Sequence, residues 1–472
     1  MTVITLLMLI LAAQEKHFPS KPNIVFILAD DLGDEDFGRR DVPSPKLDRR
    51  LKDFVSFQNS YAACPVCSPT RAAIMTGKNP ARLHLTTFLP GRPDAPSQKL
   101  LHPLIRQELP LEEVTIAERL KAIGYATACI GKWHLGGAGF GPKQQGFDVL
   151  HAGKANTTPS GAEGGKGEYD LTQQAQAFIT ANKDRPFFLY LCHNSPHIPL
   201  AARKERIEKN RASFNPIYAS MLETLDDCVD RVFQTLEEAR IADKTIVVFT
   251  SDNGGLHVPE GKDDPPTYNG PHRAGKGFLY EGGLRVPLQV RCPGCPGRLV
   301  ATPVISTDWT PTIMEWCGLP PATGMDGVSL APLFTGGSIK QRPLFWHFPH
   351  YTNQGSRPGG AIRDGNWKLI EHYEDGKLEL FDLKADMFEA HDLAAAHPAV
   401  AAELKKKLDD WKASVGAQPN TLNPNFDPAL HAKLYVETDV SKFRPQAGER
   451  AADAAKRLRE WRREMDAVVR KK

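Results

Sequence analysis

Continuous apolar runs, bounded by polar or glycine-rich segments, recur through the N-terminal part of the chain. The runs richest in β-branched and aromatic residues cover 23–29, 125–130, 186–192 and 245–250. Runs of this length without polar alternation are typical of strands that are buried on both faces of a sheet. Shorter runs at 54–57 and 288–291 predict two further strands.

Apolar residues at helical spacing separate these runs. They predict helices over 111–123, 171–181, 217–241 and 308–317, and the longest carries Met221, Leu225 and Val229 on one face. Residues 136–167 are rich in glycine, lysine and polar residues and predict a loop. Strands that alternate with helices in this way predict an α/β fold, with a large mostly parallel or mixed sheet sandwiched by helices.

The pattern changes in the C-terminal part. Short runs at 344–347, 360–363, 367–372 and 377–383 are partly joined by Asp-Gly turns, which predicts a small antiparallel sheet. We therefore expect a catalytic α/β domain over 20–335, an antiparallel-sheet subdomain with a helix over 336–428, and an extension over 429–472. The last helix, 449–469, mixes basic and acidic residues, which favours a solvated packed helix over a polyanion-binding arm. Its predicted packing face is Leu458, Trp461, Met465 and Val468.

Charge and composition exclude some classes of function, and the N-terminal segment indicates export. A net charge of +3 on 472 residues gives no general attraction to nucleic acid, and no binding to nucleic acid is expected. Residues 1–15 resemble a signal peptide without a basic start, which predicts a periplasmic or secreted bacterial protein. No later stretch is long and apolar enough to predict stable membrane insertion. The eight cysteines are scattered, and Cys292 with Cys295 predicts a plain loop or a local disulfide.

Two polar pairs follow directly after predicted strands. Asp30 and Asp31 end the first strand, and Asp252 and Asn253 end the strand at 245–250. Ligands of open α/β sheets bind at the carboxyl ends of strands, and oxygen donors there suit Ca²⁺ or Mg²⁺. Asp30 and Asp31 could equally begin a helix as capping residues.

A cysteine lies beside a predicted helix start. Pro69 is suited to open a helix and Gly77 to end it, so Cys67 should precede the helix N-terminus. Free N–H groups and the helix dipole favour an anion there, and Arg71 returns to the same side. A buried structural cysteine is the alternative interpretation.

Further donors follow other strands. Lys132 and His134 are two residues apart, so in an extended segment their side chains point the same way. His197 stands between two prolines and cannot lie inside a helix, although taken alone it could be structural. Lys276 lies in a glycine-rich loop.

Together these residues resemble a known family. The stretch Cys67-Ser68-Pro69-Thr70-Arg71, followed by AAIMTG, resembles the signature of the formylglycine-dependent (type I) sulfatases of the alkaline-phosphatase-like superfamily. The other polar sites occur in the family's order, and similarity extends over roughly 22–423, including YEGGLRVP at 280–287 and WKLI at 367–370. One departure is Asp34-Glu35-Asp36, where many members have small and aromatic residues.

The resemblance implies roles for these residues. A maturase would oxidise Cys67 to formylglycine, whose hydrate attacks sulfur, while Ca²⁺, rather than Mg²⁺, polarises the ester. The implied metal ligands are Asp30, Asp31, Asp252, Asn253 and an oxygen of converted Cys67. Arg71 would stabilise the hydrate, Lys132 and Lys276 would hold sulfate oxygens, His134 would remove a proton, and His197 with Lys276 would protonate the leaving oxygen.

The substrate is less well defined by the sequence. Stretches at 346–351 and 359–376 look like those of bacterial polysaccharide sulfatases, which implies a sulfated glycan containing galactose or N-acetylgalactosamine. Polar residues expected to overhang the site are His257, Arg273, His347, His350, Asn353 and Arg357, with ordinary surface positions as the alternative. Two rival functions stay open: a phosphoester or phosphonate hydrolase of the same fold, and a non-catalytic sulfoglycan-binding protein with unconverted Cys67.

Overall fold

Among the residues that the structure describes, the central sheet has eight strands and is mixed. The computed structural model describes residues 19–36, 45–153 and 165–470, so the expected signal peptide at 1–15 lies outside the described residues. Five neighbouring strands are parallel, and one strand runs antiparallel to both of its neighbours. The sheet order is β10 (Arg298–Val300), β2 (Val55–Phe57), β9 (Leu288–Arg291), β8 (Thr245–Ser251), β1 (Asn23–Asp30), β7 (Phe187–Pro196), β5 (Ala126–Gly131) and β6 (Val149–Ala152).

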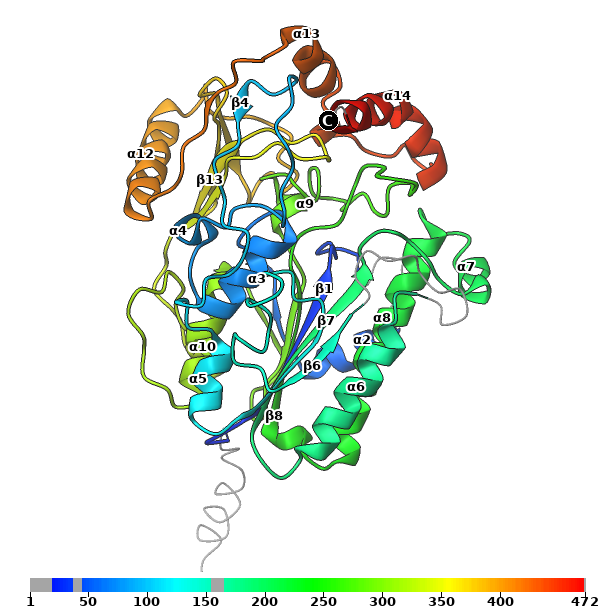
Figure 1. The fold of residues 1–472 in the computed structure, drawn as a ribbon, viewed down its shortest axis with the longest axis vertical. Helices are drawn as coiled ribbons and strands as arrows, with labels where there is room; N and C mark the ends of the chain where they lie inside the picture. The colour runs from blue at the N-terminus through cyan, green and yellow to red at the C-terminus, as the bar shows by residue number, and fades with distance from the viewer. Residues whose placement is uncertain (1–18, 37–44, 154–164, 471–472) are drawn as a thin grey trace, which may run out of the picture.

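Alternate residues of β1 pack against different helices. Ile24, Phe26 and Leu28 face one apolar cluster, whereas Val25 and Ile27 face another. The first cluster is covered by α3 (Cys67–Thr76), α5 (Ile116–Ala122), α10 (Trp309–Trp316) and α11 (Ala331–Phe334). The second is covered by α2 (Pro45–Arg50), α6 (Glu168–Ala181) and α8 (Pro216–Glu238), and Figure 1 shows the two helical layers on either side of the sheet. The predicted helix-sandwiched α/β fold is confirmed.

Three local predictions need correction. The loop predicted at 136–167 contains the edge strand β6, whose short, mostly exposed sequence carries no apolar pattern. The helix predicted from 111 begins at Ile116, because Thr115 and Glu118 form a reciprocal capping box. Helix α3 begins at Cys67, two residues earlier than Pro69 indicated, with Val66 as an extended cap.

The C-terminal region contains the predicted antiparallel sheet. Its strands pair in chain order: β12 (Leu344–Phe348), β13 (Gly359–Asp364), β14 (Trp367–His372) and β15 (Leu378–Asp382). Helix α12 (Pro398–Ser414) buries Leu404 and Leu408 against this sheet. The tail continues through α13 (Pro428–His431) to α14 (Ala451–Arg470), which lies beside the C-terminal sheet region in Figure 1. Leu458, Trp461 and Met465 of α14 are buried with Val468 packed beside them, as predicted.

Small elements complete the described chain. They are β3 (Ser60–Tyr61) paired with β11 (Val304–Ile305), β4 (Leu100–Leu101) paired with β16 (Thr421–Leu422), and the short helices α4 (Pro80–Leu83), α7 (Lys204–Lys209) and α9 (Glu281–Leu284). Cys292 and Cys295 are both free thiols, so of the two predicted alternatives the structure has the plain loop. None of the described helices has the length and apolar character needed to cross a membrane.

Candidate active site

The two polar pairs predicted at strand ends meet at one edge of the sheet. β1 and β8 are parallel neighbours with Ala29 opposite Ser251, so the residues that follow lie side by side. The backbone N–H of Asp31 donates to Asp252 Oδ1 at 3.2 Å, and Asn253 Nδ2 donates to Asp31 Oδ1 at 2.7 Å. Asp31 has a φ of 67°, a left-handed conformation that turns the chain at this point.

Cys67 is the first residue of α3 and is buried beside His134. Thr70 fixes the preceding loop by bonding both the N–H and the C=O of Cys64. The Cys67 sulfur lies 3.3 Å from His134 Nδ1, and His134 Nε2 lies 2.8 Å from the Leu89 carbonyl oxygen. A carbonyl oxygen can only accept, so Nε2 carries a proton, and Nδ1 faces position 67.

The surroundings of Cys67 favour its ionised form. Burial opposes the thiolate, but Lys132 and His134 outweigh burial and lower the pKa of Cys67 to about 6. A thiol with a lowered pKa beside cationic groups is chemically reactive rather than inert. The charge pattern therefore separates Cys67 from Cys64, whose pKa burial raises well above the ordinary value.

Arg71 holds the helix to the sheet. Its side chain is fully buried, and Nε and Nη2 lie 2.9 and 2.7 Å from Asp252 Oδ2. Its Nη1 donates to the Lys132 carbonyl oxygen at 2.8 Å. Sequence reasoning expected this guanidinium to face a bound anion, whereas the structure shows it engaged with Asp252 and the backbone.

Two buried lysines reach the acidic groups. Lys132 Nζ lies 2.7 Å from Asp30 Oδ2, and Lys276 Nζ lies 2.8 Å from Asp31 Oδ2. Burial disfavours both ammonium ions, but the carboxylates outweigh it and raise both pKa values. His197 Nε2 lies 3.6 Å from Asp31 Oδ2, and burial together with Lys276 lowers the pKa of His197 to about 3. The imidazole of His197 is thus neutral at neutral pH.

The acidic cluster fits a divalent cation. Asp30 Oδ1 and Asn253 Oδ1 are buried and have no hydrogen-bond partner among the described residues. Burial and the charge of Asp30 raise the pKa of Asp252 to about 8, although Arg71 acts against that shift. Carboxylate and amide oxygens of this kind are the donors that Ca²⁺ prefers. Lys132 and Lys276 lie beside the carboxylates of Asp30 and Asp31. If a cation bound these carboxylates, both ammonium groups would be available to bind an anion.

Sequence reasoning missed Lys166. It is buried, its Nζ donates to the Ile198 carbonyl oxygen at 2.6 Å, and burial lowers its pKa to about 8 although Asp30 acts against that shift. The residue belongs to a segment whose glycine-rich composition predicted only a loop, so no sequence pattern singled it out.

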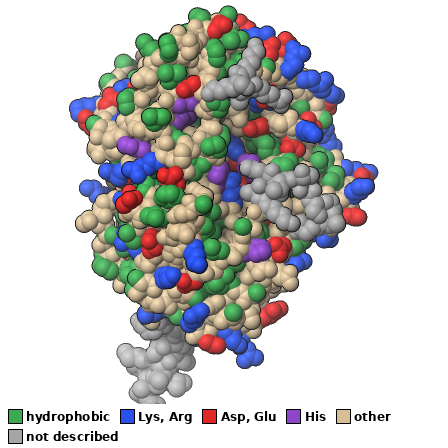
Figure 2. Space-filling model, in the orientation of Figure 1, with side chains coloured by type: hydrophobic (Ala, Val, Ile, Leu, Met, Phe, Trp, Pro, Cys, Tyr) green, Lys and Arg blue, Asp and Glu red, His purple; other side chains and the backbone are tan. Residues whose placement is uncertain are grey.

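The charged groups of the molecule are also grouped at its surface. On the face shown in Figure 2, histidine, basic and acidic side chains gather in the middle.

Most of the predicted substrate residues are part of the packing around the site. His257 Nε2 lies 3.1 Å from the Val440 carbonyl oxygen, and His350 Nε2 lies 2.7 Å from Thr86 Oγ1. His347 contacts the Tyr373 hydroxyl at 2.7 Å, and Asn353 is half-buried, with its backbone carbonyl accepting from Arg462. His257 and His350 are almost completely buried and bonded to other parts of the chain, and direct substrate contact by these two side chains stays a prediction.

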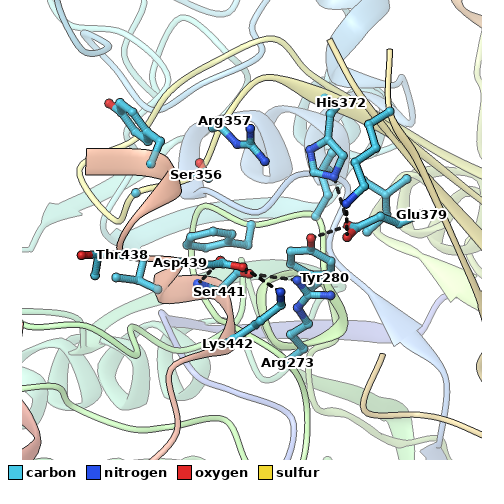
Figure 3. A pocket seen from close by; sticks show the side chains of 18 residues that line it. Arg273, Tyr280, Ser356, Arg357, His372, Glu379, Thr438, Asp439, Ser441 and Lys442 are labelled. Carbon is cyan, nitrogen blue, oxygen red and sulfur yellow. Dashed lines mark hydrogen bonds and ion pairs between the residues drawn. The ribbon is translucent and has the colours of Figure 1, made fainter. Parts of the chain in front are cut away.

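Arg273 and Arg357 line a separate polar cavity of about 90 Å³ (Figure 3). Arg273 stacks on Tyr280 and donates to Ser441 Oγ at 3.0 Å, whereas Arg357 pairs with Glu374 at 3.0 Å. The buried Arg273 side chain thus links the loop that carries Lys276 to the C-terminal segment.

The fold and the site define a hydrolase of the alkaline-phosphatase-like α/β class. The Sulfatase family model matches residues 22–319, and the model for the N-sulphoglucosamine sulphohydrolase C-terminal region matches residues 272–414. The chain belongs to the sulfatase family and is a sulfuric ester hydrolase.

Named relatives cover most of the chain. Human arylsulfatase A is 32% identical, over 87% of this chain and 92% of its own length. Human N-acetylgalactosamine-6-sulfatase is 32% identical, over 70% of this chain and 69% of its own. The crystal structure of Ps i-CgsB is similar with a TM-score of 0.72 and 28% identity, covering 83% of this chain and 93% of that one. Ps i-CgsB has also been solved in complex with k-i-k-neocarrahexaose, with a TM-score of 0.71.

Proposed function

We propose that the protein removes sulfate from a sulfated carbohydrate, using Cys67 after its conversion to formylglycine and a Ca²⁺ ion held by Asp30, Asp31, Asp252 and Asn253. The observation that carries this proposal is the position of Cys67 at the start of α3, beside His134 and close to the charged groups at the ends of β1 and β8. A maturase is the partner required for the conversion.

Formylglycine and the cation would each contribute one part of the chemistry. When present, formylglycine supplies a hydrated aldehyde as nucleophile, and the cation supplies Lewis-acid polarisation of the ester. The chain itself supplies the remaining functions. Lys132 and Lys276 bind sulfate oxygens, and such electrostatic stabilisation grows as negative charge builds in the transition state.

The two histidines handle protons. His134 Nδ1 faces position 67 while the Leu89 carbonyl fixes the ring, so His134 is placed to accept a proton from that position. We assign protonation of the leaving oxygen to Lys276 together with His197, since both side chains meet at Asp31: the Lys276 ammonium carries the proton, and the neutral His197 passes on a proton that it has received. Arg71, on α3, bonds the Asp252 carboxylate. This contact holds α3 against the end of β8 and fixes the orientation of Asp252 as a proposed cation ligand.

The proposed substrate is a glycan that contains sulfated galactose or N-acetylgalactosamine. It is supported by the names of two similar proteins: the human N-acetylgalactosamine-6-sulfatase and Ps i-CgsB, which was solved with a neocarrahexaose. Periplasmic or secreted location, proposed from residues 1–15, would bring the enzyme to such polymers.

A substrate panel tests the proposal. Protein co-produced with a maturase is assayed against defined carrageenan, chondroitin and heparin oligosaccharides, with a small aryl sulfate and its matched phosphate ester for comparison. We expect desulfation of a galactose- or N-acetylgalactosamine-based oligosaccharide and a higher kcat/KM on the sulfate than on the phosphate. Activity on the aryl sulfate alone would overturn the glycan assignment, and a preference for phosphate would favour the phosphoester hydrolase.

A further inference from the structure

A second acidic group lies just beyond the catalytic carboxylates. Asp34 and Glu35 follow β1 by a few residues, and His272 lies in the loop that leads to Lys276. One ligand atom from each of Asp34, Glu35 and His272 lies within 4.8 Å of the others. Asp34 and Glu35 belong to the acidic stretch at which the sequence departs from the family pattern, and the proposed desulfation assigns none of the three residues a role.

His272 is the feature that points to a ligand. Its side chain is almost completely buried, yet neither Nδ1 nor Nε2 makes a hydrogen bond with any of the described residues. Its Nε2 lies 3.5 Å from Asp34 Oδ2, close to the carboxylate but beyond a good hydrogen bond. A buried imidazole without a partner costs free energy that a bound metal would recover.

Arg285 is the cation beside Asp34. Its Nε lies 3.0 Å from Asp34 Oδ2 and its Nη1 lies 3.2 Å from Glu281 Oε2, a carboxylate that Lys368 also holds at 2.9 Å. Glu35 is exposed and can turn toward the other two groups. Asp36 is engaged elsewhere, because its carboxylate accepts from the Gly33 N–H and from the hydroxyls of Tyr218 and Thr267.

The donor set combines one imidazole with two carboxylates. The proposed Ca²⁺ ligands Asp30, Asp31, Asp252 and Asn253 offer oxygen atoms, although His197 lies beside Asp31 in that cluster. Imidazole nitrogen favours Zn²⁺ and related transition metals, and three protein ligands with a water complete a tetrahedral zinc site. A tetrahedral site needs its ligand atoms about 3.4 Å apart, a closure that rotation of the exposed Glu35 side chain allows.

We propose that Asp34, Glu35 and His272 bind a second divalent cation of the transition-metal class, represented by Zn²⁺. The ion would join the segment after β1, which carries Asp30 and Asp31, to the loop that carries Lys276. The bound ion would therefore hold these two segments together and stabilise the positions of Asp30, Asp31 and Lys276.

Calorimetric titration of the full chain tests the site. The protein is stripped of transition metals, saturated with Ca²⁺ and titrated with Zn²⁺ in the absence of substrate. We expect one equivalent of Zn²⁺ in the wild type. His272→Gln and Glu35→Gln should each weaken its binding by about tenfold or more while leaving Ca²⁺ uptake unchanged.

The matched control is His391→Gln. His391 is exposed and lies 3.4 Å from Asp386, so it forms the same kind of pair without burial, and its replacement should leave Zn²⁺ binding intact. Glu35→Gln keeps the test decisive if His272→Gln fails to fold, because Glu35 is exposed. Absence of Zn²⁺ binding by the wild type, or equal binding by a folded His272→Gln or Glu35→Gln variant, would overturn the site. Neither result bears on desulfation, which is measured separately.

Discussion

Functional residues were predicted both at the centre of the site and in its C-terminal surroundings. In the structure the central side chains contact one another, whereas most of those in the surroundings bond to other parts of the chain. At the centre, Asp31 and Asp252 converge because strand order places their backbones at one edge of the sheet, and Lys276 reaches Asp31 from a loop. In the C-terminal surroundings, His257 and His350 are buried and bonded to other parts of the chain. Polar residues at strand ends therefore predicted a site, whereas polar residues in loops mostly predicted packing.

The largest effect should follow replacement of the nucleophile. Cys67→Ala should lower kcat/KM on the aryl sulfate or the glycan by roughly 10⁴- to 10⁶-fold, since loss of a nucleophile removes the reaction path. The matched control is Cys64→Ala, three residues earlier in the loop that leads to α3, with the Cys64 sulfur 3.6 Å from the Thr86 carbonyl oxygen. Comparable loss in both variants would mean that the loop, rather than Cys67, is what activity requires.

A pair of histidine variants tests the contrast between the two regions directly. His134→Gln should lower kcat by about 10²- to 10⁴-fold, the usual contribution of a positioned acid or base. His350→Gln should leave kcat within about threefold and alter only stability, because its ring bonds Thr86 inside the protein. Steady-state kinetics on the folded variants measure both values of kcat. A larger loss of kcat in His350→Gln than in His134→Gln would contradict the assignment of catalysis to the centre of the site.

Arg71 should matter for stability as well as for activity. Arg71→Ala leaves Asp252 buried without its guanidinium partner, which should lower the free energy of unfolding by about 3–5 kcal/mol. Arg211→Ala breaks an exposed pair with Glu208 and should cost less than about 1 kcal/mol. Denaturant unfolding at neutral pH without added metal measures both, and equal small losses would contradict the anchoring role of Arg71.

The smallest effect is a pH dependence in the C-terminal surroundings. Burial lowers the pKa of His257 to about 4, below the value near 6.5 of an unfolded chain, so between these values the unfolded state binds the extra proton. The stability that neutral His257 contributes is complete above pH 6.5 and falls by about 1.4 kcal/mol per pH unit as the pH drops toward 4. His257→Gln should reduce the slope of unfolding free energy against pH in this window. An unchanged slope would show that His257 titrates normally.

Particular residues show why the sequence was informative at some positions and not at others. Apolar runs identified β1, β5, β7 and β8, and with them the strand ends at Asp30, Lys132 and Asp252, because burial on both faces leaves a strong pattern. The edge strand β6 has no such pattern, being mostly exposed. The positions of Lys166 beside Ile198 and of His272 beside Asp34 depend on contacts between segments distant in sequence, which no local pattern predicts.

Mass spectrometry of the tryptic peptide 53–71, from protein made with a maturase, tests the central claim most directly. The peptide contains Cys64 and Cys67, and fragmentation distinguishes them. We predict that position 67 has exchanged the elements of H₂S for oxygen, as formylglycine requires, while Cys64 keeps its thiol. A thiol at Cys67 in protein from its native host would contradict the account and favour a sulfoglycan-binding protein.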